Sequence, residues 1–285
     1  RITNFFTNSL LMKKVLGVAV ERSVPKLANQ TLESWFKNHQ PKVSKKAVYL
    51  FKDEFTNFYD AEIGKDAVIL LEKLGYEVKN IAHDESGRSH ISKGFLKEAK
   101  KICNNNIAIF KDIITDEIPL IGIEPSAILT FRDEYIRLAD DKTSAEKIAK
   151  NVFTFEEFLA KEIEKEHITD ALFTSEKKEI KIHGHCHQKA LSGTFASFKM
   201  LNIPTNYAVT ILNTGCCGMA GSFGYEKEHY KVSMQVGEDT LFPKVRNFNA
   251  DTEIAAAGTS CRHQIFDGTK RIAKHPITIL KEALK

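Results

Sequence analysis

Short runs of β-branched and aromatic residues alternate with longer amphipathic stretches from residue 46 onward. Residues 46–51 (KAVYLF) predict a strand, and the stretch from Ala61 predicts a helix that Gly75 ends before a second strand. A helix over about 92–110, a strand over 119–125 and a helical stretch from Ser126 follow. The order β-α-β-α-β-α is typical of a parallel sheet covered by helices.

The same order of elements returns after Ser175. Strands are predicted in KEIKIHG, NYAVTIL and TEIAAAGTS, and helices in GTFASFKMLNI, EKEHYKVSMQVGEDTLFPKV and CRHQIFDGTKR. Local sequences also correspond, since residues 85–88 (ESGR) fall where 216–219 (CCGM) fall, and 124–129 (EPSAIL) where 258–263 (GTSCRH) fall. We therefore expect an internal duplication of about 130 residues, with two Rossmann-like parallel-sheet α/β repeats related by pseudo-two-fold symmetry.

Four segments follow from this pattern. Residues 1–43 lack strand alternation and predict a helical N-terminal arm, and residues 139–174 predict a charged helical connector. Residues 44–138 form the first repeat and residues 175–285 the second.

Composition narrows the class of protein. A net charge of +4 with interleaved lysines and acids indicates a solvated surface, so we expect no nucleic-acid partner. No apolar run approaches the roughly 20 residues that span a bilayer. Five cysteines in a lysine-rich chain of 285 residues do not suggest a secreted disulfide framework. We expect a cytoplasmic protein, with peripheral attachment at the inner face of the membrane left open.

Four of the five cysteines lie in the second repeat, each after a predicted strand: Cys186, Cys216, Cys217 and Cys261. The carboxyl ends of parallel strands share one edge of a sheet, so these four thiols are expected to converge. Convergent thiolates suit zinc or an iron–sulfur cluster. Gly215 and Gly218 would give the Cys216–Cys217 pair the unusual dihedral angles that direct both sulfurs to one point.

Other interpretations of these residues stay open. One alternative is that the four cysteines are ordinary core thiols, as we expect for Cys103. Another is that two of them form a disulfide after oxidation. Four histidines lie beside the cysteines, His183, His185, His187 and His263, and one of them is a candidate ligand. Hydrogen bonding around the ligands is the commoner role for such histidines.

Three motifs of the second repeat, HGHCHQKAL, GCCGMAGSFGYEKEHY and GTSCRHQI, resemble a known family. This is the cysteine-rich CCG domain family, as found in heterodisulfide reductases. A similar domain forms the C-terminal part of FAD-linked oxidases of D-lactate, glycolate or D-2-hydroxyglutarate. The resemblance covers nearly the whole chain.

The resemblance implies a set of ligands and two departures from it. Cys186 matches the family's lone cysteine, Cys216 and Cys217 its pair, and Cys261 the first cysteine of its C-x2-C, whereas Gln264 stands at the last position. His263, next to that position, is then the first candidate to replace the missing sulfur. The first repeat has no ligands at the matching positions, which hold Asp53 or Glu54, Glu85 with Ser86, and Ala127. It should therefore bind no metal.

The resemblance also implies a function. The chain would be the C-terminal iron–sulfur ([4Fe-4S]-like) or zinc-binding electron-transfer module of a FAD-linked 2-hydroxy-acid oxidase. Because it has no ferredoxin cysteine run and no glycine-rich dinucleotide motif, FAD and the ferredoxin-like clusters are expected on a further domain or partner subunit, with a downstream electron acceptor. The isolated chain is not expected to be an active enzyme. A structural zinc docking domain and a thiol/disulfide redox module are the alternatives.

Overall fold

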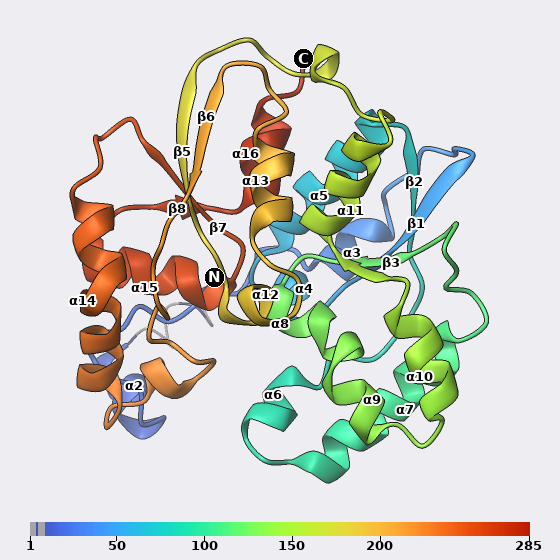
Figure 1. Cartoon of the computed structure of the whole chain (residues 1–285). Coiled ribbons are helices and arrows are strands. Elements are labelled where there is room, and N and C mark those ends of the chain that lie inside the picture. Colours follow the sequence, from blue (N-terminus) through green and yellow to red (C-terminus); the bar gives the residue numbers. More distant parts are fainter. Residues whose placement is uncertain (1–3, 5–8) are drawn as a thin grey trace.

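The computed structural model describes Asn4 and residues 9–285 (Figure 1). Eight strands were found in this part of the chain, and they form two four-stranded sheets. The first sheet holds β1 (Lys46–Phe51), β2 (Tyr76–Lys79), β3 (Leu120–Gly122) and β4 (Val152–Thr154). The second holds β5 (Lys178–His183), β6 (Tyr207–Ile211), β7 (Glu253–Ala256) and β8 (Ala273–Lys274).

Helices connect the strands and cover the sheets (Figure 1). Before β4 they are α2 (Leu10–Val15), α3 (Leu32–Phe36), α4 (Glu54–Phe58), α5 (Ala61–Lys73), α6 (Arg88–Ser92), α7 (Leu96–Phe110), α8 (Pro125–Ile128), η1 (Leu129–Arg132), α9 (Glu134–Leu138) and α10 (Lys142–Ala149). After β4 they are α11 (Phe155–Glu164), η2 (Asp170–Leu172), α12 (Cys186–Leu191), α13 (Phe195–Leu201), η3 (Phe223–Tyr225), α14 (Tyr230–Arg246), α15 (Thr259–Thr269) and α16 (Pro276–Glu282).

Both sheets are parallel throughout and have matching strand orders, β2-β1-β3-β4 and β6-β5-β7-β8. Each sheet therefore places its first strand beside its second and third strands. At this position, the chain reverses its direction of progress across the sheet. Ligand sites of open α/β sheets lie at the carboxyl ends of the strands beside such a reversal. The predicted α/β class with parallel sheets is confirmed.

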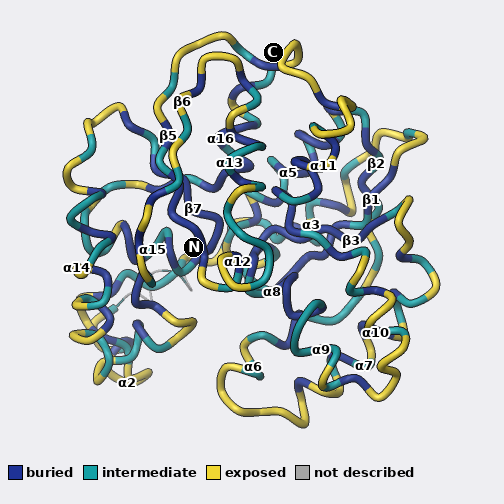
Figure 2. Tube along the Cα trace, viewed as in Figure 1, coloured by how far each residue is buried: buried dark blue, intermediate teal, exposed yellow. Residues whose placement is uncertain are grey.

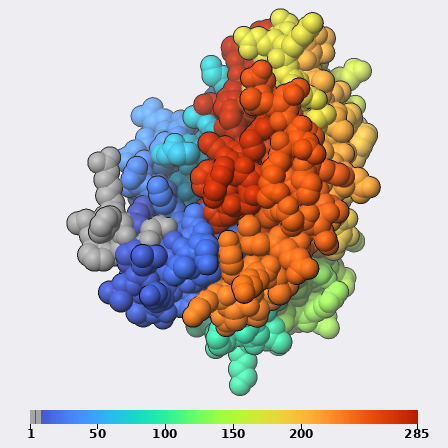
Figure 3. All heavy atoms as spheres, turned by 90° about the vertical axis from the view of Figure 1, so that its left-hand side faces the viewer, coloured from blue at the N-terminus to red at the C-terminus, as the bar shows by residue number. Residues whose placement is uncertain are grey.

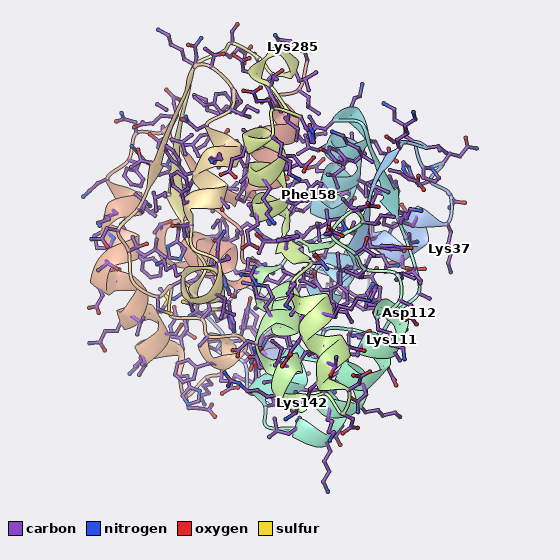
Figure 4. The ribbon with its side chains drawn as sticks, turned by 45° about the vertical axis from the view of Figure 1, so that its right-hand side comes forward. Lys37, Lys111, Asp112, Lys142, Phe158 and Lys285 are labelled. Atoms are coloured by element: carbon purple, nitrogen blue, oxygen red, sulfur yellow. The ribbon has the colours of Figure 1, made fainter. Side chains whose placement is uncertain are left out.

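The two halves share one hydrophobic core. Helix α5 packs against α16, and α11 packs against α13, so helices of both halves fill the space between the sheets (Figure 1). The buried cluster there includes Val48 and Leu70 of the first half and Ile180 and Ile277 of the second. The trace through this region is mostly buried in Figure 2. Figure 4 places Phe158 of α11 in the middle of the molecule, between Lys285 and Lys142 at opposite ends.

Two strands were not predicted from the sequence. Residues 139–174 were expected to be a helical connector, but they contain β4, which pairs with β3 through Leu120 and Val152. The segment therefore completes the first sheet as well as leading to the second. Strand β8 has only two residues and pairs with β7 through Ile254 and Ala273. Runs this short leave no alternating pattern to detect.

The described part of the N-terminal segment is less helical than expected. Between the short helices α2 and α3 the chain is mostly irregular, and Val18 forms an antiparallel bridge with Glu226 of the second half. The rest of the predicted arm, residues 1–3 and 5–8, lies outside the described residues. In Figure 3 the described part of this N-terminal segment, in dark blue, lies against the second half.

None of the helices formed by the described residues combines the length and apolar character needed to cross a bilayer.

Candidate metal centre

Three segments bring cysteine and histidine side chains to the carboxyl edge of the second sheet. His183 is the last residue of β5, and Cys186 is the first residue of α12 immediately after it. Cys216 and Cys217 lie in the loop after β6, and Cys261 lies in the first turn of α15, after β7. Because the strands are parallel, all three connections leave the sheet at this edge.

The buried side of this site contains His183, Cys217 and Cys261. Their ligand atoms all lie within 4.8 Å of one another, and the side chains are almost fully buried. The sulfurs of Cys217 and Cys261 are 3.6 Å apart. Imidazole nitrogen and thiolate sulfur are the donors that zinc and iron–sulfur sites use.

Cys186 and Cys216 form the outer side of the site. Cys186 is exposed and Cys216 is half-buried. The backbone N–H of Gly218 donates to Cys216 Sγ at 3.3 Å. Since Cys216 interacts with both Cys186 and Cys217, the four thiols form a connected row from the surface to the buried pair.

The contacts along this row shift the pKa values of the thiols in opposite directions. Hydrogen bonding from Cys186, and then from Cys217, lowers the pKa of Cys216, and the contact with Cys217, followed by His183, lowers the pKa of Cys261. The same contacts raise the pKa of Cys186 and of Cys217. Thiolate is the form that binds metal, and this arrangement favours it at two of the four sulfurs before any metal is bound.

The ring of His183 interacts with Cys261 and carries a buried nitrogen without a well-formed hydrogen bond among the described residues. Its Nδ1 is 2.8 Å from Thr214 Oγ1, whereas its Nε2 is buried and makes no hydrogen bond within the described chain. Buried polar atoms are nearly always paired. A metal ligand held by a hydrogen bond at its other nitrogen commonly has this arrangement. The residues therefore fit a soft or borderline metal.

Of the two glycines predicted to shape the cysteine loop, only Gly218 has the left-handed backbone. Its φ is +95°, and a Cβ atom there would overlap the carbonyl oxygen of Ser233 on α14. Gly218 therefore permits both the turn and the close packing of the loop on α14. Gly215 instead donates its N–H to Thr240 Oγ1 at 2.9 Å.

The three histidines that the sequence favoured lie outside the buried group. His185 caps α12, where its Nδ1 accepts the His187 N–H at 3.2 Å, and its Nε2 is 3.8 Å from Glu124 Oε1. His187 Nε2 is 3.3 Å from Arg88 Nη1. His263 lines a different pocket with Ser23 and six other residues. The structure thus brings His183, not His263, to the thiols.

Glu124, from the first half, supports this site. It caps α8 and also accepts the backbone N–H of Thr259, the first residue of α15, at 2.8 Å. The carboxylate is buried, and although burial is the largest influence on it, the charge of His185 and the bond from Thr259 hold its pKa below the ordinary value. The helix that carries Cys261 therefore begins on a charged group of the other half.

The sequence placed His183 among the histidines near Cys186 but did not favour it as a ligand. The available signal was its position as the final residue of a strand at the sheet edge where the cysteines were expected. Cys103, by contrast, lies where it was expected, in the core of the first half, with its sulfur 3.7 Å from the Tyr135 carbonyl. Burial raises the pKa of the Cys103 thiol to about 12.

No protein-family model matches the chain. Among curated proteins, it is similar to the D-2-hydroxyglutarate dehydrogenase of Haemophilus influenzae, with 27% identity over 305 residues that cover 99% of this chain and 29% of that protein. The protein of the same name from Escherichia coli K12 is 28% identical over 300 residues, covering 99% of this chain and 28% of its own length. One subunit of the anaerobic glycerol-3-phosphate dehydrogenase of Escherichia coli K12 is 27% identical over 292 residues, which cover 99% of this chain and 72% of that protein.

The chain spans less than a third of the two D-2-hydroxyglutarate dehydrogenases. A lactate utilization protein A from Bacillus licheniformis is also similar, at 27% identity over 75% of this chain and 87% of that protein. These relatives are oxidoreductases and a lactate utilization protein, which fits the family that the cysteine motifs indicated.

Proposed function

We propose that the chain is the metal-binding electron-transfer module of a FAD-linked dehydrogenase of 2-hydroxy acids. The observation that carries the proposal is the cluster of His183, Cys217 and Cys261 at one sheet edge, which Cys216 and Cys186 extend toward the surface. The similarity to D-2-hydroxyglutarate dehydrogenases and to a lactate utilization protein supports the class of substrate.

Cys186, Cys216, Cys217 and Cys261 would hold the metal group, and His183 is a further ligand on the buried side. A bound iron–sulfur cluster would supply one-electron transfer. The chain's own residues exclude water from one side of the site through the burial of Cys217 and Cys261, and leave the other side open at the exposed Cys186. Electrons would pass through that open side.

The remaining parts of the enzyme would come from a further domain or subunit. FAD, a ferredoxin-like segment and the downstream electron acceptor are proposed as partners because the chain matches only part of the longer dehydrogenases. We place the complex in the cytoplasm.

We further propose that the chain holds two duplicated repeats related by an approximate two-fold axis: the predicted first repeat, residues 44–138, extended through β4 and α11 to residue 164, and residues 175–285. The shared strand order supports this, as do the reciprocal contacts of α5 with α16 and of α11 with α13. Only the second repeat would bind metal.

The direct test is purification of the full chain without oxygen, followed by measurement of iron, zinc and acid-labile sulfide per chain. Iron and sulfide in similar amounts, with an electron paramagnetic resonance signal after reduction, are expected. A protein that takes up neither iron nor zinc would refute the proposal.

Two observations favour other uses of the same site. The combination of one imidazole with cysteines matches the ligands of structural zinc sites, so zinc without sulfide would indicate a docking domain. The 3.6 Å between the Cys217 and Cys261 sulfurs also suits thiol/disulfide exchange. Rapid alkylation of these two cysteines in the anaerobically isolated protein would favour that role, because bound metal would protect them.

A further inference from the structure

A fully buried arginine from the N-terminal segment lies beside the candidate metal centre. Arg22 is 0% exposed and is the largest fully buried side chain among the described residues. Arg22 lies in the irregular chain between α2 and α3, and its backbone carbonyl oxygen accepts a hydrogen bond from Lys13 Nζ at 2.5 Å. Burial of a guanidinium is costly unless all its donors are satisfied.

The donors of Arg22 reach three parts of the second half. Its Nε donates to the Gly224 carbonyl oxygen at 2.6 Å, and its Nη2 donates to Ser233 Oγ at 2.7 Å. Its Nη1 donates to Gln264 Oε1 and lies 3.3 Å from Asp267 Oδ2. One side chain therefore joins the segment after the cysteine pair, α14 and α15.

These contacts are close in sequence to the buried cysteines. Gln264 lies three residues after Cys261 on α15, so the two share a face of the helix. Its Nε2 donates to the Ser233 carbonyl oxygen at 2.9 Å, and Gly218, next to Cys217, packs on that same carbonyl. Ser233 thus contacts the residue after Cys217, the amide of Gln264 and the guanidinium of Arg22.

We propose that Arg22, acting through Ser233 and Gln264, is a positioning residue for Cys217 and Cys261. The position at which the family motif would place a further cysteine is used here for this hydrogen-bond network. The network fixes the cysteine loop against α15 and so sets the separation of the two buried sulfurs. The inference rests on the proposed function for its metal readout, but the placement of the thiols can be tested without metal.

The experiment compares the full-length wild type with Arg22→Gln, Ser233→Ala and the control Arg271→Gln. Arg271 is a suitable control because it also makes several bonds in the second half, donating to the carbonyls of Phe248, Asn249, Ala250 and Thr252. Zinc affinity is measured anaerobically on the reduced proteins with a competing chromophoric chelator. The urea midpoint of each metal-free protein is recorded in parallel.

Arg22→Gln is expected to weaken zinc binding by about 10- to 100-fold, the usual effect of removing a residue that orients metal ligands. Arg271→Gln should leave it close to wild type even where its urea midpoint falls as far. Equal zinc affinity in the two variants would overturn the proposal. If Arg22→Gln does not fold, Ser233→Ala decides, since it removes only the hydroxyl contact.

Alkylation of the metal-free proteins provides the second readout. Mass spectrometry should show faster modification of Cys217 and Cys261 in Arg22→Gln and Ser233→Ala than in Arg271→Gln, with Cys103 unchanged in all. Equal rates at Cys217 and Cys261 would contradict the positioning role. If the wild type takes up no metal, the proposed function fails, but the alkylation rates still decide the inference about Arg22.

Discussion

The two sheets have matching strand orders, but their carboxyl edges differ in chemistry. Glu54 opens α4 after β1 just as Cys186 opens α12 after β5. In the first half, Glu54 accepts hydrogen bonds from Ser86 N–H at 2.9 Å and from Ser86 Oγ at 2.8 Å. In the second half, Cys186 instead contacts Cys216, which stands at the position of Glu85.

The comparison extends to the next loops. Gly87 and Gly218 both have left-handed backbone, with φ of +68° and +95°. Ala127 is the third residue of α8, as Cys261 is of α15. At the first edge, the carboxylates of Asp53 and Glu54 accept hydrogen bonds from Thr56 and Ser86, whereas the second edge leaves His183 Nε2 without a hydrogen bond from the described residues. One backbone arrangement can thus support either a closed hydrogen-bond network or a set of soft ligands.

The largest effect is expected from Cys217→Ser, which replaces a buried thiolate by a hydroxyl, a poor ligand for a soft metal. Metal content per chain, measured by inductively coupled plasma mass spectrometry after anaerobic purification, should fall at least ~10-fold. Cys103→Ser is the control in the first half and should retain full metal content. If Cys103→Ser loses metal and Cys217→Ser keeps it, the contrast between the two edges is wrong.

His183→Gln should have the next largest effect, because it removes the unpaired Nε2 from the buried side of the site. Zinc affinity should fall by roughly 10-fold or more, as measured by chelator competition. His263→Gln is the matched control, since His263 lines a separate pocket. Loss of affinity in the His263 variant alone would restore the ligand that the sequence favoured.

Glu156, in the first half, is expected to make the stability of the protein depend on pH. It is the second residue of α11, where α16 has Ile277, and both of its carboxylate oxygens are buried without a hydrogen-bond partner among the described residues. Burial raises its pKa from 4.5 to about 7. Between these values the folded state holds a proton that the unfolded state has released, so wild-type stability falls as pH rises through this window, by about 3 kcal/mol in total.

Glu156→Gln removes this dependence. Relative to wild type, its free energy of urea unfolding should therefore increase between pH 4 and pH 8 by up to about 3 kcal/mol. Glu164→Gln, at an exposed position of the same helix, serves as the control and should show no such gain. A difference between wild type and Glu156→Gln that stays constant with pH would show that Glu156 does not titrate in this range.

The smallest effect is expected from Ser86→Ala in the first half. It removes the hydroxyl that donates to Glu54 and accepts the Arg88 N–H at 3.1 Å. The free energy of unfolding should fall by about 1–3 kcal/mol, while metal content stays at the wild-type level. A loss of metal in this variant would mean that the first edge takes part in the site.

The sequence predicted most of this framework, because long amphipathic helices and runs such as 46–51 and 178–183 have clear periodicity. It did not predict β4 or β8, whose few residues acquire strand geometry only from their neighbours. The sequence could not show which histidine lies beside the cysteines, because residue spacing does not give the directions of the side chains. On α15, residues 261 and 264 share a face and residue 263 does not, so His263 adjoins Gln264 in sequence without lying in the buried cluster. The direction of His183 depends on the end of β5, which only the folded sheet defines.

The shared core between the sheets has a consequence for how this chain can change over time. Helices α5 and α11 of the first half are the interior surface on which α16 and α13 of the second half rest. Removing the first half would expose those helices to water and would also take away the Glu124 cap of α15. The first half is therefore required for the fold of the second half even if it binds no metal. Selection for a stable core is enough to retain it.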